Sequence, residues 1–102
     1  MILFVFITKN HDRFSEMLRT NHYYVDLLKS NIAKQVVVDL ENPVGLNGHE
    51  DLANFYDIPY DNSMVLAYGD RPHEIVGKWI DPKESDINEM CHMAEQFEMS
   101  LH

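Results

Sequence analysis

The chain opens with an unbroken apolar run, Ile-Leu-Phe-Val-Phe-Ile, at residues 2–7. A strand with one face in water alternates apolar and polar residues, whereas a strand covered on both faces is apolar throughout. The run therefore predicts a strand in the middle of a sheet. It has no basic segment before it and no small-residue cleavage site after it, and it is too short to cross a bilayer. We therefore expect neither a signal peptide nor a membrane segment, and a location in the cytoplasm.

A helical pattern separates this run from a second one. Asp12 is placed to cap the start of a helix, and apolar residues recur at helical spacing from Phe14 to Leu28, interrupted at Asn21. We expect one helix of nearly twenty residues, kinked near Asn21. Residues 35–40, with three consecutive valines, then predict a strand. Because strand–helix–strand units form right-handed parallel crossovers, the two strands should be parallel.

The second half of the chain predicts a hairpin between two further helices. Its elements are a loop at 41–48, a short helix at about 49–56, strands at 63–68 and 74–80 around a five-residue turn, and an amphipathic helix whose apolar stripe runs from 87 to 101. Such a short turn makes the two strands antiparallel neighbours. In the short helix, Leu52, Ala53 and Tyr56 should face the core.

The resulting order, βαβαββα, is that of the thioredoxin-like fold. Residues 35–101 resemble the second half of thioredoxins. The resemblance lies in the final helix and in four stretches before it: VVVDLEN, DLANFYDIP, SMVLAYGD and HEIVGKWI. We therefore expect an α/β protein with a mixed four-stranded sheet and helices on both faces. A chain of 102 residues allows one core, so residues 1–102 should form a single domain.

The resemblance implies a redox site that this chain lacks. Thioredoxins and glutaredoxins place C-x-x-C where the first strand meets the first helix, and a glutaredoxin-like alignment puts Asp12 and Ser15 on the two cysteine positions. The family's cis-proline position is Asn62, and Pro59 lies three residues too early. A dithiol cycle needs one thiolate to attack and a second to resolve the mixed disulfide. With Cys91 as its one cysteine, the chain cannot run that cycle by itself.

Cys91 lies on the apolar stripe of the last predicted helix, where a cysteine is usually a small buried hydrophobe with a raised pKa. The six histidines show no H-x-x-H or H-E-x-x-H spacing, so we expect no metal site and no cofactor. His11 beside Asp12 could form an acid/base pair. Because no nucleophile, oxyanion donors or Gly-rich loop accompany it, we interpret the pair as turn and capping residues.

The charge is strongly negative, with a formal net charge of −9. Residues 35–70 contain no Lys or Arg but seven acidic residues. The residues after Lys83 likewise include acidic side chains but no Lys or Arg. Such a surface repels phosphate backbones, so direct nucleic-acid binding is not expected. It is either an ordinary solvated face or a surface that docks on a basic partner protein.

Two functions remain open. The first is a non-catalytic thioredoxin-like module, such as an accessory or viral protein acting on a host factor, that binds another protein in a groove between residues 9–14 and 60–63. The expected partner-binding residues are Lys9, Asn10, His11, Asp12, Asp57, Tyr60, Asp61 and Asn62. The second is a single-thiol or glutathione-linked enzyme on the same scaffold. The reactivity of Cys91 would separate the two.

Overall fold

The computed structural model describes residues 1–41, 52–69 and 74–100. Its elements are, in chain order, β1 (Ile2–Ile7), α1 (Asp12–Thr20), α2 (His22–Lys29), β2 (Lys34–Asp39), α3 (Leu52–Phe55), β3 (Ser63–Ala67), β4 (Ile75–Ile80) and α4 (Glu84–Ser100). The four predicted strands are confirmed to within a residue, and the last helix is confirmed, beginning at Glu84, three residues before its predicted apolar stripe. Parts of four predictions lie outside the described residues: the loop and the short helix at 42–51, the hairpin turn at 70–73 and the end of the last helix at 101.

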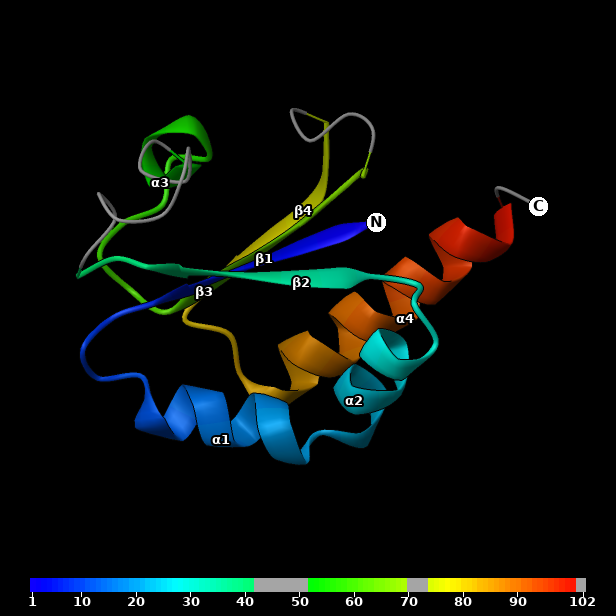
Figure 1. Cartoon of the computed structure of the whole chain (residues 1–102), viewed down its shortest axis with the longest axis horizontal. Helices are drawn as coiled ribbons and strands as arrows, with labels where there is room; N and C mark the ends of the chain where they lie inside the picture. The colour runs from blue at the N-terminus through cyan, green and yellow to red at the C-terminus, as the bar shows by residue number, and fades with distance from the viewer. Residues whose placement is uncertain (42–51, 70–73, 101–102) are drawn as a thin grey trace.

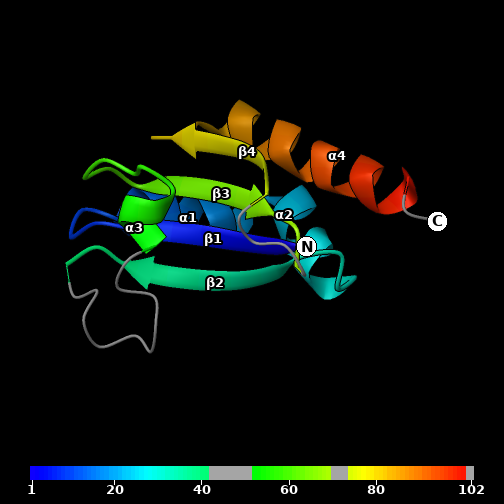
Figure 2. The same ribbon diagram turned by 90° about the horizontal axis from the view of Figure 1, so that it is seen from above.

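The four strands form one mixed sheet in the order β2-β1-β3-β4. β1 is parallel to β2 and antiparallel to β3, and β3 is antiparallel to β4. The predicted parallel pair, the antiparallel pair and the central place of the first strand are therefore confirmed (Figure 2). The protein is an α/β protein.

Helices lie on both faces of this sheet, as Figure 1 shows. α1, α2 and α4 cover one face, where Leu3 and Val5 of β1 join a core that includes Ile87 and Met90 of α4. On the other face, Phe4 and Phe6 pack against residues in and after α3, among them Leu52, Ala53 and Tyr56. β1 is apolar at every position because each of its faces belongs to one of these two cores.

The first helix was predicted as one helix kinked near Asn21, and this prediction is wrong. The segment forms two helices, α1 and α2. Asn21 separates them in an extended conformation, with φ −79° and ψ 115°. Its side chain is buried, and Oδ1 accepts a hydrogen bond of 3.0 Å from the backbone N–H of Tyr24. Its Nδ2 donates to Oε1 of Glu84 at 2.9 Å and to Oδ1 of Asn88 at 2.8 Å, both on α4. Asn21 thus caps α2 and fastens it to α4.

Asp12 was predicted as the cap of α1, and this prediction is wrong. The helix begins at Asp12, and His11 occupies the N-cap position without a side-chain bond to a free backbone amide. The imidazole Nδ1 of His11 lies 2.9 Å from Oγ of Ser15 instead. The Asp12 carboxylate lies in the first helical turn, where its charge still favours the positive end of the helix dipole.

Asn21 generates a test of stability. Replacing Asn21 with Ala removes the cap acceptor of α2, and it takes the donor from the half-buried Asn88 and the exposed Glu84 of α4. We expect the free energy of unfolding to fall by about 2–3 kcal/mol. Urea unfolding followed by far-UV circular dichroism measures it. The neighbouring exposed Thr20→Ala should change it by less than about 0.5 kcal/mol. Equal midpoints for the two variants would contradict the role given to Asn21.

Candidate functional site

One end of the sheet gathers the loops that the sequence singled out. β1, β2 and β4 end there and β3 begins there, because β1 is parallel to β2 and antiparallel to β3, and β3 is antiparallel to β4. Figure 2 shows these chain ends side by side. We call this surface the loop end, formed by residues 8–13, 39–41, 60–62 and 81–84.

Asn62 joins two of these loops. Its Oδ1 accepts hydrogen bonds from the backbone N–H of Thr8 at 2.8 Å and from the Thr8 hydroxyl at 3.1 Å. Its Nδ2 donates to the backbone carbonyl of Asn10 at 3.2 Å. The Asn62 carbonyl in turn accepts from the N–H of Asp81 at 2.8 Å, which brings in the β4–α4 connection. One half-buried side chain and its own backbone therefore hold three loops together.

A hollow of about 570 Å³ lies beside Asn62. Asn10 and Phe14 line it from the first loop and α1, so it lies between the two segments that were expected to form a groove. Residues 81–84 add a wall that the sequence did not indicate. Its charged lining is mixed, because Arg13 and Lys83 are balanced by Asp81 and Glu84.

Most of the other predicted site residues lie at the loop end, but Asp57 does not. Lys9 and Asp12 are exposed at the loop end, and the backbone N–H of Lys9 donates to Oε1 of Glu41 at 3.2 Å. Tyr60 is 56% exposed, and Asp61 beside it is exposed as well. Asp57 lies just after α3 with a left-handed φ of 57°, and within the described residues no side-chain contact joins it to the Asn62 loops.

His11 and Ser15 are the one histidine–serine contact at this end among the described residues. Activating a serine needs a base whose ring is oriented by a third group. In the described part of the chain, no carboxylate is hydrogen-bonded to the His11 ring. The geometry therefore matches a side-chain contact within the first turn of α1 rather than a nucleophile and its base.

Cys91 is buried, as predicted, with 1% of its surface exposed. Burial, with a smaller contribution from the nearby Glu95 carboxylate, raises the pKa of its thiol from 9.0 to about 12. His92 next to it is exposed and contacts Gln96, with 3.1 Å between Nε2 of each. The thiolate, which is the reactive form, is therefore scarce near neutral pH.

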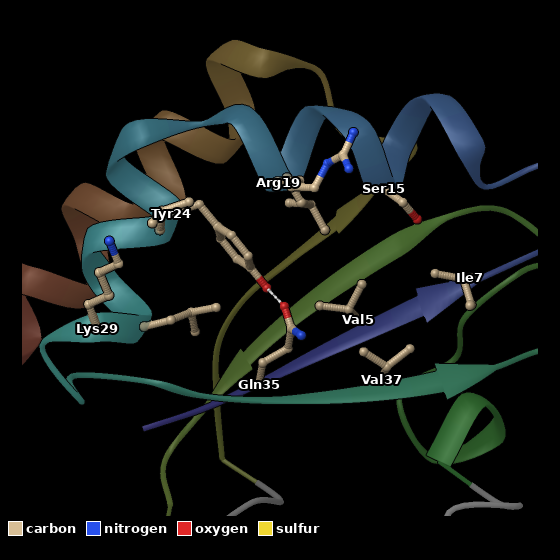
Figure 3. A pocket seen from close by; sticks show the side chains of 11 residues that line it. Val5, Ile7, Ser15, Arg19, Tyr24, Lys29, Gln35 and Val37 are labelled. Carbon is tan, nitrogen blue, oxygen red and sulfur yellow. Dashed lines mark hydrogen bonds between the residues drawn. The ribbon is translucent and has the colours of Figure 1, made fainter.

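Sequence reasoning missed an apolar pocket of about 410 Å³ between α1, α2 and the β1–β2 half of the sheet, shown in Figure 3. Val5 and Val37 form its floor, and Val37 is 43% exposed. The Tyr24 hydroxyl donates to Oε1 of Gln35 at one end, and burial raises the pKa of Tyr24. A run of valines does not reveal which strand is an edge strand, so the sequence gave no sign that Val37 would be uncovered.

Comparison with known proteins finds no family model, curated protein or solved structure that matches the chain. Within residues 1–41, 52–69 and 74–100, no three His, Cys, Asp or Glu side chains are grouped so that they could hold a metal ion. No helix among these residues has the length and apolar character needed to cross a membrane.

The burial of Cys91 has a pH-dependent consequence. Replacing Cys91 with Ala should lower the free energy of unfolding by about 1 kcal/mol near pH 7. The pKa of the Cys91 thiol is about 12 in the folded protein and 9.0 as the ordinary value. As pH rises, the thiol therefore loses its proton in the unfolded chain before it does so in the folded protein. The stability that Cys91 contributes is therefore complete below pH 9.0 and is lost as pH rises toward about 12.

Urea unfolding of the wild type and of Cys91→Ala at several pH values between 7 and 11 measures this difference. The difference in unfolding free energy between the two proteins should narrow above pH 9.0. Burial, the larger cause of the raised pKa of Tyr24, is present in both proteins, and the smaller effect of Cys91 on Tyr24 is part of the same difference. A gap that stays constant or widens would show that the thiol is not buried as described. Rapid labelling of the native protein at pH 8 would lead to the same conclusion.

Proposed function

We propose that this chain is a thioredoxin-like domain without the redox site, and that it binds another protein through the loop end of its sheet. The strand order β2-β1-β3-β4, with one parallel pair and helices on both faces, supports the thioredoxin-like topology. Asp12 and Ser15 occupy the place that the family gives to its two thiols, and Asn62 the place of its cis-proline.

The observation that carries this proposal is the set of hydrogen bonds made by Asn62. It ties the start of β3 to Thr8 and Asn10, the loop after β1, without any thiol or proline at this position. A surface built from loops that are already fixed loses less conformational entropy when a partner docks. Tyr60, an exposed aromatic side chain two residues away, is the type of residue that anchors protein interfaces.

The charge of the loop end favours a partner with a basic surface. Among its described residues, acidic side chains outnumber basic ones: Asp12, Asp39, Glu41, Asp61, Asp81 and Glu84 against Lys9, Arg13 and Lys83. Complementary charge speeds the encounter of two proteins more than it tightens the final complex. We therefore assign the acidic residues to steering and the Tyr60 region to contact.

The burial of Cys91 speaks against the alternative, a single-thiol or glutathione-linked enzyme. The thiol is 1% exposed, its pKa is raised to about 12, and it lies on α4. Reactive cysteines lie in partly exposed, electropositive surroundings that lower the pKa. Glu95 beside Cys91 acts in the opposite direction.

The steering role can be measured once the partner has been captured from the native source with the tagged chain. Asp57→Asn and Asp61→Asn together should slow association and reduce its dependence on salt, since charges act over a Debye length of about 8 Å at physiological ionic strength. Asn is chosen because Asp57 has a left-handed φ of 57°, a conformation that Asn adopts more readily than Lys. Stopped-flow or surface-plasmon measurements give the association rate.

Asp26→Asn on α2 together with Glu89→Gln on α4 is the matched control, because both residues are exposed and the pair also removes two negative charges. It should leave the association rate close to that of the wild type. Melting temperatures should agree for all three proteins, because exposed charges contribute little to stability. If the double variant and the control associate equally fast, the acidic surface at Asp57 and Asp61 is only a solvated face.

A further inference from the structure

The pocket of Figure 3 has the lining of a site for an aliphatic chain. Val5 and Val37 are register partners on neighbouring strands, and Ile7 lies on the same face two residues along β1. Leu18 of α1 and Leu28 of α2 form the walls. Small-molecule sites are typically concave, mostly apolar hollows with a few polar groups, and about 410 Å³ is within their usual size.

One end of this pocket carries the polar groups. The Tyr24 hydroxyl donates to Oε1 of Gln35, which leaves the Gln35 amide N–H groups as donors. Figure 3 shows this amide nitrogen turned toward Val5. Among the described residues, no acceptor is hydrogen-bonded to it. A ligand in the pocket can therefore place an acceptor at the Gln35 end.

The charged residues of the lining have one sign. Arg19 and Lys29 border the pocket, and no acidic side chain lines it, although the chain as a whole has a formal net charge of −9. The guanidinium of Arg19 pairs with Glu16, but both side chains are largely exposed, and such pairs are held weakly. Arg19 can therefore turn toward a bound anion at small cost in free energy.

The direction of the ligand follows from the same register. Asp39 is the partner of Ile7 at the far end of the pocket, and its carboxylate would repel a second one. We propose that the pocket binds a free single-chain carboxylate. Its carboxylate lies at Gln35, at the end of the pocket that Lys29 also borders, and its aliphatic tail lies along Val5 and Val37 toward Ile7. This site is separate from the loop end and does not depend on the function proposed for it.

The test is a titration of the isotope-labelled protein with decanoate below its micelle concentration, followed by methyl and amide NMR spectra. We expect saturable shifts centred on Val5, Val37 and Leu28. Decanol and decyltrimethylammonium have the same chain without the negative charge, and should bind more weakly, by about tenfold or more if one charged contact is lost. Equal affinity for the cationic analogue would overturn the proposal, as would shifts that do not saturate.

Two substitutions locate the site. Val37→Trp fills the pocket from a position exposed enough to accept a larger side chain, and should abolish binding while the protein stays folded. Lys29→Gln should weaken decanoate severalfold and leave decanol unchanged, whereas Lys83→Gln at the loop end should change neither. Undiminished binding by Val37→Trp, or binding to anionic phospholipid vesicles in place of free decanoate, would contradict the assignment.

Discussion

The buried amide of Asn21 is the interaction on which the arrangement of the helices depends. It ends α1, caps α2 and donates two hydrogen bonds to α4, so one side chain sets the relation between three helices. In a continuous helix through this position more backbone groups would be paired, but Asn21 could not cap α2. A buried polar group without partners destabilises the fold, so the three hydrogen bonds of the Asn21 side chain should form together. The position of α4 in turn buries Cys91, and the separation of α1 from α2 leaves part of the β1–β2 face open as a pocket.

Asn62 has a similar role at the loop end. Like Asn21, it uses both its carbonyl oxygen and its amide nitrogen, and it joins segments more than fifty residues apart in sequence. The two asparagines therefore fix two different surfaces of one small domain. One surface is the set of loops through which we propose that a partner protein binds, and the other is the apolar pocket in which we propose that a small ligand binds.

The sequence predicts the parts of this fold that follow from apolar periodicity. The unbroken run at β1 gave a central strand, and the stripe through Met90 and Cys91 gave the last helix and its buried thiol. The break at Asn21 was underestimated because an interrupted stripe does not say whether the side chain will find partners sixty residues away. The exposure of Val37 could not be foreseen either, since a valine run looks the same on an edge strand as on a central one.

The candidate site was predictable to a similar extent. The segments around Asn10 and Asn62 were paired by the order of the elements, because strands that alternate in direction return their loops to the same end of a sheet. The wall at 81–84 was missed because its approach depends on a backbone hydrogen bond from Asp81 to Asn62, which no pattern in the sequence indicates. Asp57 was included for its charge alone, and its left-handed backbone shows that its place also has a structural reason.

Site-specific photo-crosslinking tests the central claim, that the loop end is the binding surface. Tyr60 at the loop end is 56% exposed and Tyr23 on α2 is 61% exposed, so the two positions are matched in residue type and accessibility. A benzoylphenylalanine introduced at each position would be irradiated in extract of the native source. The account predicts one stoichiometric crosslinked partner from position 60 and none from position 23. Crosslinking of that partner from position 23 with equal yield, or from neither position, would contradict it.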